Sequence, residues 1–432
     1  MTRRDSFDAA LAEWLEDEAT GTTPASLHDD AIRAARVVRQ RPLLLVMVRG
    51  GVDFGPRLGI RRPVATRFVL VILALALLVA ALALVVVGGP RPIANGRILL
   101  ARETTGPKAE YFTIRPDGTD EVKFLEASEC GQCTFWSPDG RRIMMPKVID
   151  GRLRTAVIAP DGTGEVVLAF PGETLFLGPG DWSPDGRQLA LQGFDPSDAS
   201  RAGIFITASD GSSIKRITTS TDGRSTESPK FSPDGRRIVF LAVDADTAPA
   251  GLGFAGDLFV VETNGGVPRQ LNPAGTKALA TGQTGQPIDW SPDGRQLVFA
   301  AVEGALADGR SAVFKVDVEG GVPVRISDFG QFLVSVEWSP DGKWIAYGEV
   351  TSGNESTWIA HPDGSGVRQL TGPGTPVVGC CATWSPDGTR LLIQRGTVGS
   401  RDLWTMDLAG NVLDRISSTA ATYVWYSWAP QP

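Results

Sequence analysis

Short strand-length runs of apolar and β-branched residues alternate with tight turns over most of this 432-residue chain. The stretch that begins at Phe231 is typical, and its runs are Arg237–Ala242, Asp257–Glu262 and Val267–Leu271. Turns such as Thr263–Gly266 combine Gly with Asn, Asp or Pro, the residues that favour hairpin geometry. A further strand leads into the next stretch. The pattern predicts four short strands in each unit and no helix in this part of the chain.

The unit recurs, and its most regular part is a five-residue turn. The sequence Trp-Ser-Pro-Asp-Gly, or Phe-Ser-Pro-Asp-Gly, occurs six times, and a weakened copy, Trp428-Ala429-Pro430, lies near the C-terminus. The six copies begin 46 to 59 residues apart, at Trp136, Trp182, Phe231, Trp290, Trp338 and Trp384, and the weakened copy follows 44 residues later. A period of this size indicates an array of identical supersecondary units.

The two ends of the array complete one another. Gly96–Leu100 matches the strand that follows the turn in other units, although no turn precedes it. Tyr423–Trp428 supplies the strand that this first unit lacks, so the ring closes without an open edge. Residues 96–432 number 337, and 337/7 is about 48 per unit. We therefore predict an all-β fold over 96–432, a seven-bladed propeller of four-stranded blades.

These repeats resemble the TolB-type propeller repeat, a WD-like family whose hallmark is the Trp-Ser-Pro-Asp-Gly turn. The resemblance covers the chain after residue 95 and implies the propeller fold. It says little about activity, because such blades serve in scaffolds, binding modules, lyases and the propeller half of some serine peptidases.

A membrane span is predicted at residues 68–87, twenty residues without a polar side chain. The alternatives are a buried helix or a signal peptide, and a signal peptide would lie nearer the N-terminus. Residues 33–67 hold nine Arg and one acid, which places residues 1–67 in the cytoplasm and the propeller outside. The linker 88–95 reaches at most about 28 Å. It enters at Gly96, where a tight turn would otherwise be. We therefore expect the face that carries the tight turns (the tight-turn face) to lie near the membrane, and the opposite loop face to point away.

The cytoplasmic segment 1–67 shows two short amphipathic patterns followed by a linker. Phe7, Leu11, Trp14 and Leu15 share a helix face, and a second pattern runs from Leu27 to Val38. Two short helices before one span resemble bacterial membrane anti-sigma factors, although no zinc-type signature of His and Cys is present. Two interpretations stay open, a simple anchoring tail and a segment at residues 5–40 that binds a cytoplasmic partner.

Composition and motifs argue against several classes of protein. The net charge of −7 disfavours a nucleic-acid partner, which requires a basic surface. Of the two histidines, His28 lies in the cytoplasmic segment and His361 in a tight turn, so neither suits a catalytic triad or a zinc site in the propeller. We therefore expect no catalytic residue, no metal site and no cofactor, and a protein that is not an enzyme.

The four cysteines form two clusters, Cys130 with Cys133 and Cys380 with Cys381. Cys133 and Cys381 each stand three residues before a repeat Trp, so the clusters occupy equivalent places in two blades. An oxidising compartment favours two local disulfides, each of which pins a connection. A redox pair or a cysteine metal site is the alternative interpretation.

The residue just before the repeat aromatic is charged in four consecutive units: Asp181, Lys230, Asp289 and Glu337. If the strand that leads into the turn is innermost, these side chains line the channel. They then form either a ligand or cation site or a hydrated wall in which Lys230 balances its neighbours. The aspartates of the repeated turns are interpreted as turn residues, and the repeat Trp residues as packing between blades. The longest connections, which include Asn272–Ile288, are predicted loops where binding concentrates.

We expect, as the best overall interpretation, a single-pass cell-membrane protein with an extracytoplasmic propeller. The propeller acts as a binding or scaffold module for an envelope protein, peptide or glycan, and it can signal to the cytoplasm. The alternative is a lyase-like propeller enzyme with an acidic, metal-dependent site at the channel mouth. The absence of a well-placed histidine as general acid or base separates the two.

Overall fold

The fold was examined in a computed structural model, which describes residues 96–430 with gaps. The gaps are 105–107, 128–133, 169, 171–174, 196, 220–223, 244–253, 273–274, 281–286, 304–309, 331, 352–353, 374, 376–380, 398–399 and 418–422. The cytoplasmic segment 1–67, the predicted span 68–87 and the linker 88–95 lie outside the described residues, and these assignments stay predictions. Within the described ranges, no helix has the length and apolar character needed to cross a membrane.

The described residues are almost entirely β-structure, with one short 3₁₀ helix, Ala199–Arg201. Their strands form six hydrogen-bonded sheets, five of which have four strands. In spatial order these are β29 (Tyr423–Trp428), β1 (Ile98–Glu103), β2 (Ala109–Ile114) and β3 (Val122–Ala127); β4 (Phe135–Trp136), β5 (Ile143–Ile149), β6 (Arg152–Ile158) and β7 (Val166–Leu168); β8 (Phe176–Trp182), β9 (Gln188–Phe194), β10 (Gly203–Ala208) and β11 (Ile214–Arg216); β21 (Phe332–Trp338), β22 (Ile345–Thr351), β23 (Asn354–Ala360) and β24 (Arg368–Thr371); and β25 (Thr383–Trp384), β26 (Arg390–Thr397), β27 (Ser400–Asp407) and β28 (Val412–Arg415).

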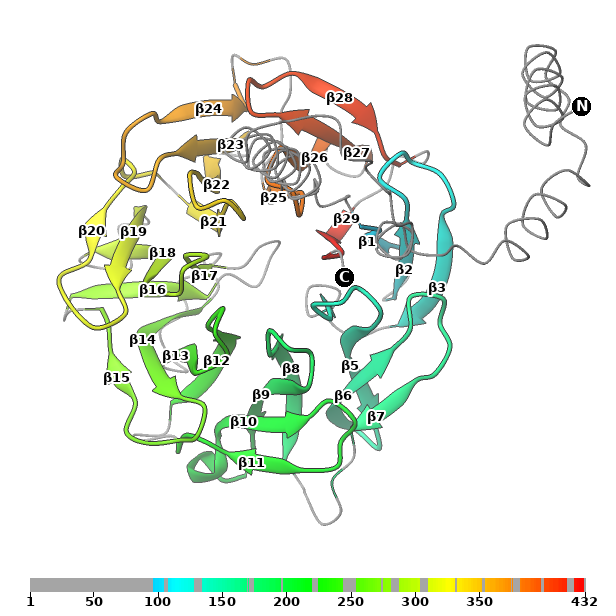
Figure 1. The fold of residues 1–432 in the computed structure, drawn as a ribbon, viewed down its shortest axis with the longest axis vertical. Coiled ribbons are helices and arrows are strands. Elements are labelled where there is room, and N and C mark those ends of the chain that lie inside the picture. The colour runs from blue at the N-terminus through cyan, green and yellow to red at the C-terminus, as the bar shows by residue number, and fades with distance from the viewer. Residues whose placement is uncertain are drawn as a thin grey trace, which may run out of the picture. The chain divides into compact units, whose positions relative to one another are not determined.

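The sixth sheet has nine strands and contains the units that begin at Phe231 and Trp290. Its strands are β12 (Ser225–Phe231), β13 (Arg237–Val243), β14 (Phe254–Glu262), β15 (Arg269–Gln270), β16 (Thr276–Ala280), β17 (Ile288–Trp290), β18 (Gln296–Glu303), β19 (Ser311–Asp317) and β20 (Val324–Arg325). The sheets stand around a central axis like the blades of a propeller (Figure 1). In each unit the strand that ends on the repeat aromatic is innermost. The predicted all-β propeller fold is confirmed.

One strand of the nine corrects a sequence expectation. The connection Asn272–Ile288 was expected to be a loop, but it contains β16, which pairs with β14 on one side and with β18 on the other. The residue pairs Ala255↔Leu279 and Ala278↔Ala301 join two neighbouring units. An extra strand forms here because β14 and β18 extend past their partners and would otherwise leave backbone groups unpaired. Two predicted four-stranded blades are therefore one continuous sheet.

The ring closes as the sequence pattern predicted. Strand β1 pairs with the C-terminal strand β29, with Ile98 opposite Trp428. Beyond the paired strands, the backbone N–H of Ala429 donates to the carbonyl of Arg97 at 2.6 Å. The first four-stranded sheet thus combines both ends of the propeller, and this offset is confirmed.

The repeated turn is held by its own side chains. Ser232 Oγ donates to Asp234 Oδ1 at 2.6 Å and accepts from the N–H of Arg237 at 3.0 Å, while Asp234 also accepts from the N–H of Arg236 at 3.1 Å. The aspartates at the equivalent place make the same serine contact: Asp139, Asp185, Asp293, Asp341 and Asp387. Their interpretation as turn residues is confirmed.

The hydrophobic core lies largely between neighbouring units. Trp290 is only 4% exposed and belongs to one buried cluster with Val239 and Leu241 of the preceding unit. Phe299 and Phe314 of its own unit belong to the same cluster, with stacked rings whose centroids lie 6.0 Å apart. This arrangement confirms that the repeat aromatics pack between blades. Since successive side chains of a strand point to opposite faces of the sheet, the residue before the aromatic lies on the other face of the blade.

Candidate functional site

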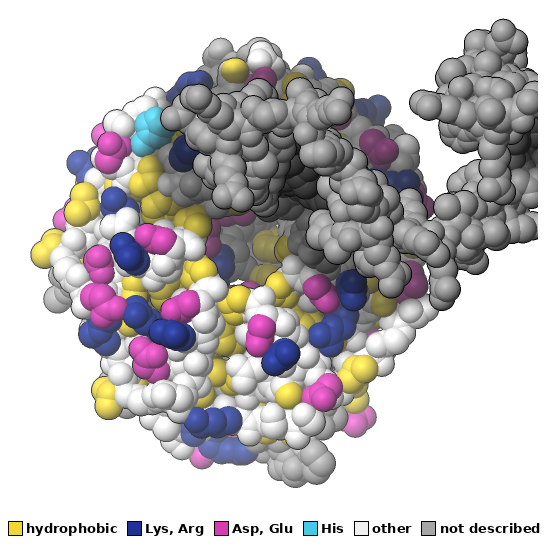
Figure 2. All heavy atoms as spheres, viewed as in Figure 1, with side chains coloured by type: hydrophobic (Ala, Val, Ile, Leu, Met, Phe, Trp, Pro, Cys, Tyr) yellow, Lys and Arg dark blue, Asp and Glu magenta, His cyan; other side chains and the backbone are white. Residues whose placement is uncertain are grey.

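A cavity of about 470 Å³ lies at the centre of the ring, enclosed by the inner strands. Its wall includes the residue just before the repeat aromatic in six units, namely Phe135, Asp181, Lys230, Glu337, Thr383 and Ser427. Its other lining residues include aromatic side chains and the prolines of three turns: Trp136, Trp384, Trp425, Tyr426, Trp428, Pro340, Pro386 and Pro430. The hollow at the centre of the propeller is visible in Figure 2. The volume falls in the range of small-ligand pockets.

Several inner strands are irregular directly before the charged position. Strand β8 has a bulge between Pro179 and Asp181, and β12 has one between Glu227 and Lys230. Ser228 in the second bulge has a φ of 53°, which is uncommon for a residue other than Gly. Bulges redirect the side chains that follow them. Here they precede two of the charged residues at the cavity.

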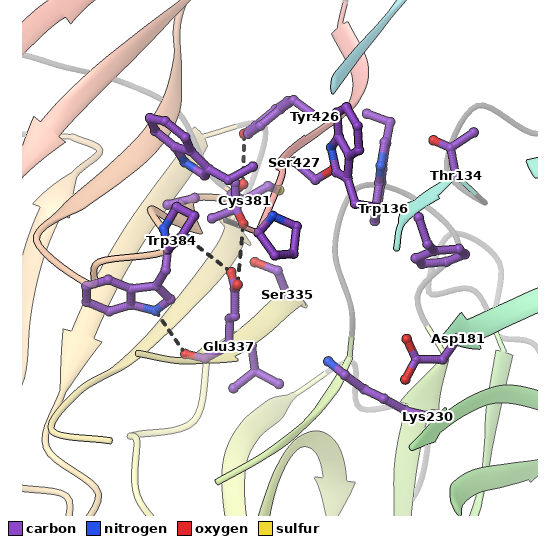
Figure 3. A pocket seen from close by; sticks show the side chains of 18 of the residues that line it. Thr134, Trp136, Asp181, Lys230, Ser335, Glu337, Cys381, Trp384, Tyr426 and Ser427 are labelled. Atoms are coloured by element: carbon purple, nitrogen blue, oxygen red, sulfur yellow. Dashed lines mark hydrogen bonds between the residues drawn. The ribbon is translucent and has the colours of Figure 1, made fainter. Parts of the chain in front are cut away.

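The structure brings together the four charged residues singled out in the sequence. Lys230 Nζ pairs with Asp289 Oδ1 at 2.6 Å, and both side chains are largely buried. In Figure 3 the Lys230 ammonium points into the space between Asp181 and Glu337. Asp181, Lys230 and Glu337 line the cavity, and Asp289 reaches it through its contact with Lys230.

The three carboxylates also join neighbouring units. Each accepts a hydrogen bond from the backbone N–H of the repeat aromatic in the next unit. The contacts are Asp181 Oδ2 with Phe231 (2.9 Å), Asp289 Oδ2 with Trp338 (2.8 Å) and Glu337 Oε2 with Trp384 (3.3 Å). Lys230 has no acceptor to offer, and the N–H of Trp290 instead donates to Asp289 of its own unit at 2.9 Å. These residues therefore have a structural role in addition to lining the cavity.

Indole groups make a second contact at the same position. Trp182 Nε1 donates to the carbonyl of Phe135 at 3.1 Å, and Trp384 Nε1 donates to the carbonyl of Glu337 at 3.3 Å. Trp136 Nε1 and Trp425 Nε1 are buried and have no hydrogen-bond partner among the described residues. Trp428 Nε1 and Ser427 Oγ are in the same state, so four polar groups at the cavity wall are left without a partner among the described residues.

Burial in the cavity shifts the proton affinities of its acids. It raises the pKa of Asp181 to about 6, against the opposing effect of Lys230. Burial and then the nearby charge of Asp289 raise the pKa of Glu337 to about 8. Burial disfavours the charged form of Lys230, yet Asp289 and Asp181 outweigh it and raise the pKa of that ammonium. At neutral pH Glu337 is therefore mostly neutral, and Lys230 is charged.

Of the four cysteines, the structure describes Cys381, and Cys130, Cys133 and Cys380 lie outside the described residues. Cys381 lines the cavity, is disulfide-bonded, and its carbonyl accepts from the hydroxyl of Tyr426 at 2.8 Å. The predicted pairing of the two clusters stays a prediction. Over the described ranges, no three His, Cys, Asp or Glu side chains converge as metal ligands would.

Sequence reasoning missed two features of this region. Trp425 and Tyr426 of the last strand form an aromatic part of the cavity wall. From the sequence, this strand was predicted only to close the ring. Glu227 was also overlooked, and burial raises its pKa to about 7 although Ser225 favours the charged form. The Ser-Pro pair between Glu227 and Lys230 is the sequence signal for a bulge that could have marked it.

Comparisons with known proteins support the fold alone. No family model matches the chain. An uncharacterized protein of Agrobacterium fabrum is 26% identical over 114 residues, which cover 26% of this chain and 35% of that relative. The match therefore spans only about a third of the relative's length.

Among solved structures, similar chains are TolB-like and other β-propeller proteins. TolB from Acinetobacter baumannii is 18% identical with a TM-score of 0.44, covering 77% of this chain and 82% of that chain. An oligogalacturonate lyase in complex with manganese is 13% identical with a TM-score of 0.52, covering 68% and 81%. A prolyl endopeptidase is 15% identical with a TM-score of 0.50, covering 74% of this chain and 50% of that one.

Proposed function

We propose that this chain is a single-pass cell-membrane protein whose extracytoplasmic, seven-bladed TolB-like propeller binds an envelope protein, peptide or glycan at its central cavity. The observation that carries the proposal is the cavity itself, whose wall combines buried acids with aromatic side chains. Residues 68–87 supply the anchor, and residues 5–40 supply a surface for a cytoplasmic partner.

The charges at the cavity favour one class of ligand group. Asp181, Asp289 and Glu337 provide three carboxyl groups, and Lys230 is the one cation that contacts them in the described part of the chain. A bound amine or guanidinium group would neutralise the remaining negative charge, and its positive charge would favour the ionised form of Glu337. Aromatic faces such as that of Trp136 add cation–π attraction. A peptide segment with a basic group therefore fits better than a neutral glycan.

Crosslinking capture from native membranes tests this function. The full-length protein is compared with Glu337→Gln, which keeps the size of the side chain and its acceptor for the N–H of Trp384. Asp117→Asn in an exposed turn is the matched control, because Asp117 contacts only its own turn and does not line the cavity. We expect the wild type and the control to capture the same envelope partner, and Glu337→Gln to lose it. Equal capture by all three would contradict binding at the cavity.

One observation favours the alternative of a lyase-like enzyme. Asp181 and Glu337 lie in the same cavity with pKa values raised to about 6 and about 8, and separated values of this kind suit an acid and a base. A lyase would cleave an acidic glycan by proton abstraction and leave an unsaturated sugar. Ultraviolet absorbance by that product, with and without added manganese, would support the alternative if Asp181→Asn abolished it.

A further inference from the structure

Exposed valines recur on the hairpins that join the third and fourth strands of three consecutive units. Val267 is 94% exposed, Val322 83%, Val324 58% and Val367 48%. They follow the turns between β14 and β15, β19 and β20, and β23 and β24. Isolated exposed apolar residues are common, but the same residue type at the same place in three neighbouring units forms an organised surface.

Each of these valines is close in sequence to an exposed arginine. Arg269, Arg325 and Arg368 lie one or two residues after a valine, and none of the three pairs with a carboxylate among the described residues. The middle turn holds two exposed acids, Asp317 and Glu319, and Glu319 is paired with Arg237 at 2.7 Å. In Figure 2 yellow and dark-blue side chains lie beside magenta ones along the rim over β15, β20 and β24. Arg269 donates to the carbonyl of Val318, and Arg325 and Arg368 lie over the rings of Phe329 and Trp344. Their charges are thus not neutralised by a carboxylate, and apolar side chains beside such cations suit the boundary between acyl chains and anionic headgroups.

The valines lie on the face at which the chain enters the propeller. The turns that follow the first and third strands of an antiparallel sheet lie at the same end of that sheet. Gly96 is at this end, because Arg97 contacts Ala429 directly after the last inner strand. The linker of eight residues, 88–95, connects this point to the predicted span 68–87.

The two points of attachment lie on opposite sides of the ring. The chain enters the sheet β29-β1-β2-β3, whereas the hairpins of β15 and β20 lie across the axis, and that of β24 is separated from the entry sheet by the sheet β25–β28 (Figure 1). A tether at one edge alone would let the disc tilt. Apolar contacts at the far edge would hold it flat against the bilayer.

We propose that Val267, Val322, Val324 and Val367, with Arg269, Arg325 and Arg368, form a surface (the valine rim) that rests on the anionic bilayer in which the chain is anchored. This inference depends on the membrane anchor of the proposed function. It adds that the tight-turn face contacts lipid and that the loop face is left for ligands in the envelope.

The test uses full-length protein reconstituted in vesicles of phosphatidylcholine and phosphatidylglycerol. A photoreactive residue replaces Val322, and in a second protein it replaces Phe194. Phe194 is the matched control, because it is also an exposed apolar residue (42%) but ends β9 on the loop face. After irradiation, lipid adducts are quantified by mass spectrometry. We expect at least about fivefold more lipid adduct at position 322 than at 194.

Three outcomes separate the proposals. Protein that does not float with the vesicles contradicts the anchor of the proposed function. Protein that floats but forms equal lipid adducts at 322 and 194, or protein adducts instead of lipid adducts at 322, overturns the valine rim and leaves the anchor standing. With the photoreactive residue at position 367, Val267→Asp with Val322→Asp should reduce the lipid adduct, while Val267→Ile with Val322→Ile should preserve it. No reduction by the aspartates would also overturn the inference.

Discussion

Two adjacent positions on the inner strands have opposite characters. The repeat aromatic and the turn after it are nearly identical in six of the seven units, and the Ser–Asp contact of the turn is the same in those six. The residue one place earlier is Phe135, Asp181, Lys230, Asp289, Glu337, Thr383 or Ser427. The first position packs between blades, and the second lines the central cavity in six units. The repeat thus specifies the fold, whereas the departures from repetition at the neighbouring position give the cavity its chemistry.

The largest effect on stability should come from replacing a repeat aromatic. Trp290→Ala removes a buried indole that packs on the preceding unit and donates to the carbonyl of Lys230 at 3.2 Å. We expect a loss of about 4 kcal/mol in the free energy of unfolding, since large-to-small changes of core aromatics cost about 3–5 kcal/mol. Chemical denaturation of the purified protein in detergent measures it. Trp344→Ala, at a half-buried indole stacked on His361, is the control and should cost much less.

At the residue just before the repeat aromatic, stability should depend on charge and not on side-chain volume. Lys230→Met leaves Asp289 buried without its cation, and we expect a loss of about 3 kcal/mol, at the lower end for a broken buried pair. Adding Asp289→Asn should restore part of that stability. A double-mutant cycle with no coupling between the two positions would show that their pairing contributes nothing.

Glu337→Gln tests whether this position responds to pH. The pKa of Glu337 is raised from 4.5 in the unfolded chain to about 8 in the folded protein, so the folded state retains a proton that the unfolded state releases. The contribution of Glu337 to stability should therefore be greatest below pH 4.5 and fall as pH rises from about 4.5 to 8, with a slope of about 1.4 kcal/mol per pH unit. Asp181 adds a fall between 3.8 and about 6. Denaturation at a series of pH values should show a flatter profile above pH 6 for Glu337→Gln, and an unchanged profile would contradict the assignment.

The smallest effect should come from the turn itself. Ser291 Oγ donates to Asp293 Oδ1 at 2.6 Å and accepts from the N–H of Gln296 at 2.9 Å. Ser291→Ala should cost about 1–2 kcal/mol, as expected for local hydrogen bonds in a turn that keeps its backbone conformation. The same change at Ser183 should cost the same, because its contacts match. Unequal costs at these two serines would mean that the turns are less equivalent than their sequences.

The sequence predicted the fold because each unit repeats the same turn chemistry and the same alternation. It also indicated that Asp181, Lys230, Asp289 and Glu337 lie near one another, since they occupy the same repeat position on the innermost strands. Strand β16 could not be predicted, because its pairing depends on how far β14 and β18 extend past their partners. The hydrogen bonds by which Asp181 and Asp289 join neighbouring units could not be predicted either. The N–H groups that donate to them belong to residues about 50 positions away in the chain.

The central claim is that the cavity beside the repeat aromatics is where this propeller binds its ligand. The most direct measurement places a photoreactive residue at Ser427, a half-buried residue of the cavity wall, and irradiates native membranes. The same residue at Val148, which is 49% exposed away from the cavity, is the comparison. The account predicts a discrete crosslinked partner at position 427, absent at 148 and lost on adding Glu337→Gln. The same partners at both positions, or a crosslink at 427 that Glu337→Gln does not change, would contradict it.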